Sequence, residues 1–184
     1  MKTYLYKSLP ANMSPYGHNF VAGKWYKIDG DILICNNGFH ASKNIIDAMG
    51  YVAAEVLAKV EVRGDSIKQE DKECWSEMRL VKTYKWTKKD SVLFAIFAAE
   101  LVLKNYEDKY PNDLRPRQAI EAAKKVLKQD NEKNRSAASA AASAAERAAW
   151  SAAARAAASA AERAASAAIF KKCHDFVIKR AGLK

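Results

Sequence analysis

The sequence predicts an α+β protein, with a small N-terminal antiparallel-sheet domain that carries one or two helices, followed by an alanine-rich all-α helical bundle. Short alternating apolar runs separated by turn residues fill the first 88 residues, which is the pattern of strands. After residue 88 the apolar residues recur at helical spacing. Residues 136–168 are mostly Ala, the residue with the highest helix propensity. We therefore expect two domains, over residues 1–88 and 89–184.

In the first half, strands are expected at residues 3–9, 24–28, 32–35, 56–64 and 78–86. The dipeptide Asp29-Gly30 suits a tight turn, so residues 24–28 and 32–35 are expected to pair as a hairpin. Ser42 is the expected N-cap of a helix over residues 43–52. Its apolar face would consist of Ile45, Ile46, Met49 and Val52.

The second half is expected to form three helical regions around the alanine-rich segment. The first helix is expected to begin at Asp90-Ser91 and to end before Pro111, and Pro116 suits the first turn of the next helix. Residues 130–135 interrupt the pattern, and the last helix is expected over residues 169–180. The residues of the last helix that are expected to face inward are Ile169, Phe170, Cys173, Phe176 and Val177.

Within the alanine-rich segment, residues 136–168, the Ser and Arg residues from Ser139 to Arg163 lie four positions apart. Each step of four residues turns about 40° around a straight helix, so this polar line cannot stay on one face. Either one long helix is wrapped by its neighbours, or the segment folds back as two helices. We favour a break near Trp150 or within residues 136–143, with Trp150 packed as an anchor among the small side chains.

The formal net charge of +10 is unevenly distributed. Residues 1–88 hold 13 basic and 10 acidic residues, whereas residues 89–184 hold 18 and 11. A positive field favours acidic protein surfaces or polyanions, which leaves nucleic acid open as a partner. The three cysteines form no CxxC pair, the opening MKTYLYKSLP lacks the apolar core expected of a secretory signal, and no apolar run is long enough to cross a bilayer. We expect a cytoplasmic protein with no membrane partner, and a homo-oligomer is left open.

The residues that could carry chemistry are few. The three histidines are too scattered to indicate a metal site, and a nucleophile and base formed by Cys35 and His40 would need spatial adjacency and a third orienting group. The favoured interpretation is a turn in which Phe39 is packed and His40 is hydrogen-bonded. Arg115 and Arg117 are expected to fix their turn by bonding Asp113 or helix-end carbonyls.

The second half contains an acidic, aromatic YP-x-D turn, an RPR-x-AIEAA helix and repeated AA-x-RAA, and this pattern resembles the Imm-5-like family of immunity proteins. The resemblance covers residues 92–180 and implies that the chain binds and neutralises a protein partner, without catalytic residues. The matching residues are Tyr110, Pro111, Asp113, Arg115, Pro116, Arg117, Ala119, Ile120 and Glu121.

The first half, and above all the motif Cys35-x-x-Gly38-Phe39-His40-Ala41-Ser42, is similar to a small domain of unknown function common in phage proteins. More distantly, the order of strand, G-F-H-x-S, helix and V-x-V-x-G strand resembles NAD-dependent ADP-ribosyltransferases. That likeness implies NAD as cofactor in a groove around Tyr6, Phe39, His40 and Ser42, with Tyr6, His40 and Ser42 as catalytic residues. The sequence departs from these enzymes because no clear catalytic Glu lies in the expected late strand. The available carboxylates are Glu61, Glu70 and Glu77.

Together these features predict a non-enzymatic phage or mobile-element inhibitor that binds and blocks a bacterial protein, an anti-CRISPR inhibitor being one concrete form. The alternatives are an ADP-ribosyltransferase-like enzyme that uses NAD and a basic nucleic-acid-binding protein. No cofactor and no metal are expected under the favoured interpretation. The residues expected to contact the partner are Tyr110, Asp113, Arg115, Arg117, Phe39 and His40.

Overall fold

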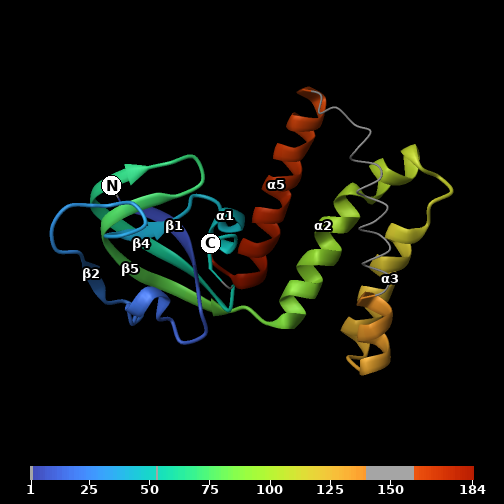
Figure 1. Cartoon of the computed structure of the whole chain (residues 1–184), viewed down its shortest axis with the longest axis horizontal. Helices are drawn as coiled ribbons and strands as arrows, with labels where there is room; N and C mark the ends of the chain where they lie inside the picture. Colours follow the sequence, from blue (N-terminus) through green and yellow to red (C-terminus); the bar gives the residue numbers. More distant parts are fainter. Residues whose placement is uncertain (1, 53, 140–159) are drawn as a thin grey trace. The chain divides into compact units, whose positions relative to one another are not determined.

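The computed structural model describes residues 2–52, 54–139 and 160–184. They divide into two compact units, Met1–Thr87 together with His174–Lys184, and Lys88–Cys173. An antiparallel sheet with a short helix comes first along the chain and long helices follow, which confirms the predicted α+β class (Figure 1).

The first unit is built on a five-stranded sheet with the order β1-β4-β5-β2, in which β3 also pairs with β5. All of these pairs are antiparallel. The strands are β1 (Thr3–Leu9), β2 (Trp25–Lys27), β3 (Phe39–Ala41), β4 (Val56–Lys68) and β5 (Glu73–Lys85). The expected strands at residues 3–9, 24–28, 56–64 and 78–86 are thereby confirmed.

The expected strand at residues 32–35 and its hairpin with residues 24–28 are wrong. β2 pairs with β5 instead, and Leu33 forms only an isolated bridge with Asn37. The side-chain amide of Asn37 donates hydrogen bonds of 2.9 Å to the carbonyls of Asp29 and Asp31. Because these carbonyls are bonded within the segment, the chain closes here as a loop and not as a second strand.

The short helix α1 (Ile45–Met49) begins two residues later than predicted. Its N-cap is Asn44, whose Oδ1 accepts a hydrogen bond of 2.8 Å from the backbone N of Ile46. Ser42 cannot cap the helix because its backbone exchanges two hydrogen bonds of 2.8 Å with Tyr6 of β1. The predicted Ser42 cap is therefore wrong, and Ser42 instead pairs with β1 at the edge of the sheet.

Strands β4 and β5 are each 13 residues long, well beyond the ranges predicted for them. The residues of β4 that the prediction missed, 65–68, are exposed on both faces, so the alternation that marks a half-buried strand is absent there. The residues of β5 that it missed, 73–77, begin with three consecutive buried residues, so they show no alternation either. The pairing register shifts between Arg63 and Ser66, around Gly64 at a φ of +82°. A Cβ at Gly64 would lie 2.3 Å from Ser76 Oγ, so this bulge requires glycine.

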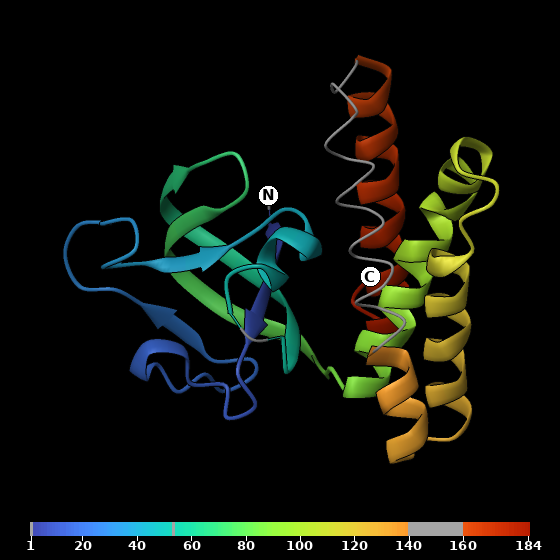
Figure 2. The same ribbon diagram turned by 45° about the vertical axis from the view of Figure 1, so that its right-hand side comes forward.

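The second unit contains α2 (Lys88–Lys109) and α3 (Arg115–Lys128), which lie side by side (Figure 2). Pro116 occupies the first turn of α3, as predicted. The helix predicted to begin at Asp90 begins at Lys88 instead, and Asp90 is only 1 % exposed. Residues 130–135 interrupt the helices only in part, because residues 132–139 are helical.

The last helix, α5 (Ala160–Ala181), includes the predicted residues 169–180. Cys173 and Val177 are buried as expected, whereas Phe170 is 39 % exposed, so its predicted inward position is wrong. The ends of the alanine-rich segment, residues 136–139 and 160–168, are helical. Trp150 and most of the predicted break region lie outside the described residues.

Candidate functional site

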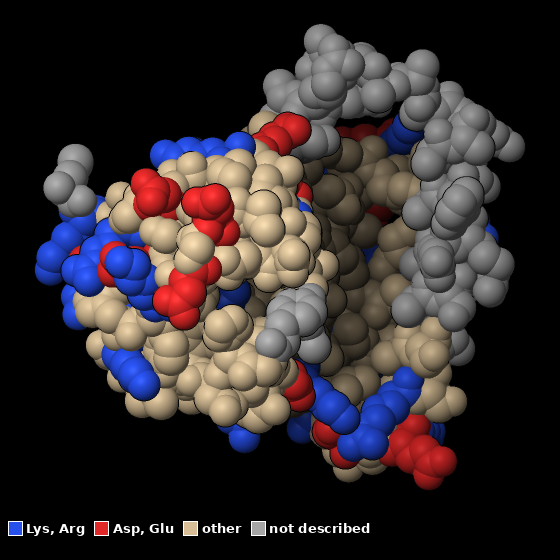
Figure 3. Space-filling view, turned by 60° about the vertical axis from the view of Figure 1, so that its left-hand side comes forward, with Lys and Arg blue, Asp and Glu red and all other residues tan. Residues whose placement is uncertain are grey.

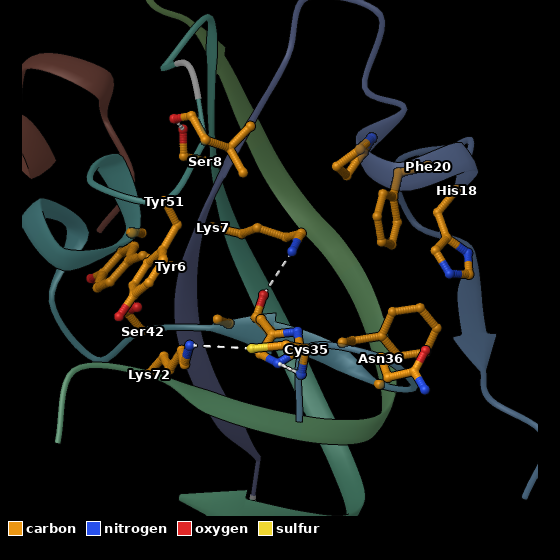
Figure 4. Close-up of a pocket in the computed structure, with 17 residues that line it drawn as sticks. Tyr6, Lys7, Ser8, His18, Phe20, Cys35, Asn36, Ser42, Tyr51 and Lys72 are labelled. Carbon is orange, nitrogen blue, oxygen red and sulfur yellow. Dashed lines mark hydrogen bonds between the residues drawn. The ribbon is translucent and has the colours of Figure 1, made fainter. Parts of the chain in front are cut away.

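A cavity of about 330 Å³ lies in the first unit, against β1, β3 and α1. Tyr6, Ser42 and Tyr51 lie on one side of it, His18 and Phe20 lie on the other, and Lys7 reaches between them (Figure 4). Tyr6, Phe39, His40 and Ser42, which the sequence singles out, all line this cavity. The antiparallel bridge between Tyr6 and Ser42 joins β1 to the end of β3 and brings these residues together.

Lys7 occupies an unusual position in β1. Side chains alternate along a strand, so Lys7 shares the face of Leu5 and Leu9, which both belong to the hydrophobic core. Its Nζ donates a hydrogen bond of 2.7 Å to the carbonyl oxygen of His40 and lies 5.9 Å from the centre of the Phe20 ring. Burial lowers the pKa of Lys7 to about 8, against the opposing effect of Cys74.

His40 is held on β3 beside two cations. Its Nε2 accepts a hydrogen bond of 3.2 Å from the backbone N of Cys35, so the neutral ring carries its proton on Nδ1. Burial, and then the nearby charges of Lys7 and Lys72, lower the pKa of His40. The predicted packing of Phe39, which is 3 % exposed, and hydrogen bonding of His40 are confirmed, but both residues lie in β3 and not in the predicted turn.

The Cys35 thiol does not meet His40 as a nucleophile would meet its base. The bond to the imidazole comes from the backbone of Cys35, whereas its Sγ lies 3.6 Å from Lys72 Nζ. Cys35 has a φ of +65°, a conformation that a residue other than glycine seldom adopts, within the tight turn before β3. Cys74, by contrast, is buried, and its burial is the largest of the causes that raise the pKa of its thiol.

The mouth of the cavity is formed by Lys72, in the turn between β4 and β5, and by Tyr51. Lys72 Nζ lies 4.8 Å from the centre of the Tyr51 ring. The Tyr51 hydroxyl donates a short hydrogen bond to Asp71, which raises the pKa of Tyr51 to about 12. Asp71 is thereby engaged with Tyr51 beside the cavity, and it is not among the lining residues.

None of the described residues that line the cavity is Asp or Glu. Glu61 is paired with Arg79 at 2.5 Å, and Glu77 is paired with Arg63 at 2.7 Å. Glu70 lies in the turn between β4 and β5 and is exposed. The lining residues therefore do not provide the carboxylate that an ADP-ribosyl transfer would need, and we derive no step through NAD.

The other predicted residues lie in the second unit, at the turn between α2 and α3. Arg115 donates two side-chain hydrogen bonds to Asp113, at 2.8 and 2.6 Å, as predicted. The Tyr106 hydroxyl donates to the same carboxylate at 2.7 Å, and these bonds hold the pKa of Asp113 well below its usual range. Arg117 bonds Glu107 of α2 at 2.7 and 2.6 Å, and not the predicted Asp113 or a carbonyl.

These ion pairs fix the turn while leaving its outer surface open. Leu114 is 53 % exposed, and the side chains of Arg115 and Arg117 are about half exposed. The ring of Tyr110 packs 5.0 Å from that of Tyr106. Tyr110, Asp113, Arg115 and Arg117 therefore form one surface, which we call the α2–α3 turn surface, whereas Phe39 and His40 belong to the other unit.

Phe39 does not suit a role in contacting a protein partner, because its ring is buried among His18 and Phe20. The residues that sequence reasoning missed are Lys7 and Lys72. The signal for Lys7 is present in the sequence, since it is a charged residue in the apolar register of Leu5 and Leu9. Lys72 has no comparable signal, since only the pairing of β4 with β5 brings it to the cavity.

Charges of both signs are interspersed on the face of the first unit drawn in Figure 3. Among the residues that the structure describes, no group of three or more His, Cys, Asp or Glu side chains could hold a metal ion. No described helix has the length and hydropathy that crossing a bilayer requires.

Residues 82–179, more than half of the chain, match the family model described as "Imm-5 like putative immunity protein". The chain therefore belongs to the Imm-5 like family, which confirms the resemblance of its second half. Residues 3–89 match a domain of unknown function, DUF7666. No curated protein and no solved structure gave a match to the chain.

Proposed function

We propose that this chain is a non-enzymatic immunity-type inhibitor that binds and blocks a bacterial protein, and that the α2–α3 turn surface makes the contact. Membership of the Imm-5 like family is the observation that carries this proposal. An immunity protein acts by occupying its partner, so its function requires a preorganised surface and not a catalytic set. An anti-CRISPR inhibitor is one concrete form of such a protein.

The α2–α3 turn surface has the properties that a binding surface needs. Its backbone is fixed by the Asp113–Arg115 and Glu107–Arg117 pairs, so little conformational entropy would be lost on binding. Leu114 offers an exposed apolar side chain at its centre. A guanidinium has five N–H donors, and each of these bidentate pairs uses two of them, so both arginines keep donors for a partner's carboxylates.

The charge of residues 89–184, with 18 basic and 11 acidic residues, supports a partner with an acidic surface. Such a field speeds the encounter with an acidic protein. It would also attract nucleic acid, which is the outcome that the experiment has to separate.

Affinity capture from nuclease-treated bacterial lysate, with the full chain as bait, tests the proposal. Arg115→Glu reverses one charge of the turn surface, and Lys128→Glu makes the same change in the last turn of α3. We expect a specific protein to be retained by the wild-type chain and by Lys128→Glu and to be lost with Arg115→Glu. A parallel capture from untreated lysate that retains nucleic acid and no specific protein would contradict the proposal. Equal capture by both variants would contradict it as well.

A further inference from the structure

We propose that the cavity around Lys7 binds a small anion that carries a flat ring. This inference concerns the first unit and does not depend on the proposed inhibitory function. It rests on the charges that line the cavity, on the hydrogen-bond donors that remain available there, and on its aromatic wall.

The charge of the cavity has one sign. Lys7 and Lys72 line it, and the described lining residues include no Asp or Glu. Removing an ammonium group from water is costly unless an opposite charge compensates it. Within the described residues Lys7 has no carboxylate at ion-pair distance, so a bound anion would supply the missing charge.

Donors remain for such an anion. An ammonium group has three N–H donors, and within the described residues Lys7 uses one of them, on the carbonyl of His40. The Lys7 chain extends across the cavity between its two walls, and Lys72 approaches from the mouth (Figure 4).

The wall opposite Tyr6 is aromatic. The rings of His18, Phe20 and Phe39 contact one another, with centroids 5.5 to 6.1 Å apart in tilted or edge-on arrangements. Such rings favour a flat ring placed against their faces or edges. The volume, about 330 Å³, lies at the small end of the range for ligand sites, so the ligand is small.

Titration calorimetry on the full chain at pH 7, in a buffer without phosphate, tests this proposal. The probe is AMP, which combines a phosphate with a flat ring system. Adenosine lacks the charge, and inorganic phosphate lacks the ring. We expect AMP to bind at least ten times more tightly than either.

Two variants and one control locate the binding. Lys7→Met keeps the length of the side chain without the charge, and Lys72→Met does the same at the mouth. Lys59→Met is the matched control, because Lys59, like Lys7, is a strand lysine over an aromatic ring. Its Nζ lies 4.8 Å from the centre of the Tyr4 ring, and it does not line the cavity. We expect Lys7→Met to weaken AMP binding at least tenfold, Lys72→Met to weaken it severalfold, and Lys59→Met to leave it within twofold.

Several outcomes would overturn the proposal. They are no AMP binding up to 10 mM, adenosine or phosphate binding as tightly as AMP, and equal AMP binding by the wild-type chain and Lys7→Met. Circular dichroism checks that each variant is folded. If Lys7→Met does not fold, the comparison of Lys72→Met with Lys59→Met decides, and equal binding by these two overturns the proposal.

Discussion

The ammonium group of Lys7 donates a hydrogen bond to the carbonyl oxygen of His40, 2.7 Å away, from a position in β1 that alternation assigns to the core. This contact joins β1 to β3 and places a cation at the centre of the cavity. The neighbouring charges are those of His40, Lys72 and Cys74. A positive charge in this setting affects both the stability and the reactivity of the chain.

We predict that Lys7 makes stability depend on alkaline pH. The pKa of Lys7 is lowered to about 8 from 10.5, so below pH 8 the folded state carries the cost of a buried charge. Between about pH 8 and 10.5 the unfolded chain binds more protons, so the stability of the wild-type chain relative to Lys7→Met rises, by roughly 2–3 kcal/mol. Urea unfolding of both proteins across this range measures the difference.

Cys74 also contributes at alkaline pH. Burial raises its pKa, which by itself lowers stability there in both proteins, and the effect is no smaller in Lys7→Met because Lys7 lowers the pKa of Cys74. A difference between the wild-type chain and Lys7→Met that stays constant from pH 7 to 10.5 would contradict the prediction.

The same lowered pKa predicts that Lys7 becomes a nucleophile at lower pH than a lysine with the ordinary pKa of about 10.4. Only the neutral form of an amine reacts with acylating reagents. Lys7 lines a cavity that small reagents can enter. Brief acetic anhydride labelling, read by peptide mass spectrometry, should show half-maximal labelling of Lys7 near pH 8. Lys59 serves as the internal control. A midpoint of Lys7 labelling near 10.5 would show that its charge is not desolvated.

We predict that Gly38→Ala destabilises the chain strongly. Gly38 has a φ of +143°, and a Cβ there would lie 2.3 Å from the Sγ of buried Cys74. Gly23→Ala is the control, since Gly23 has a φ of +81° with nothing within 4 Å of the added Cβ. We expect a loss of about 3 kcal/mol for Gly38→Ala and about 1 kcal/mol for Gly23→Ala in urea unfolding. Equal losses would mean that contact with Cys74 adds nothing.

The pair of Arg79 and Glu61 predicts a further large effect. Glu61 is only 6 % exposed and accepts both hydrogen bonds from Arg79, at 2.9 and 2.5 Å. Arg79→Met leaves this carboxylate buried without its partner, so we expect a loss of about 3 kcal/mol in unfolding free energy. Lys104→Met, which removes one member of an exposed pair with Asp108, should change stability little. A small effect of Arg79→Met would show that Glu61 is compensated elsewhere.

Local signals account for what could be predicted. Pro111 and Pro116 mark the end of α2 and the start of α3, because proline cannot occupy a helix interior but suits its first turn. The Arg115–Asp113 bond could be predicted because the two residues are neighbours within one turn. The bond of Arg117 to Glu107 could not be predicted, because it joins residues that are ten positions apart and lie on two different helices. The length of β4 was underestimated at residues 65–68, where both faces meet solvent, and that of β5 at residues 73–77, where three consecutive residues are buried.

By itself, the sequence determined the α+β class, most of the strands, the two long helices and the membership of the Imm-5 like family. Each of these depends on periodicity or on residues close together along the chain. Only the tertiary structure decided that β2 pairs with β5 and that Lys7, His40 and Lys72 share one cavity. Strand pairing joins residues far apart in sequence, and the burial that lowers the pKa of Lys7 exists only after that pairing.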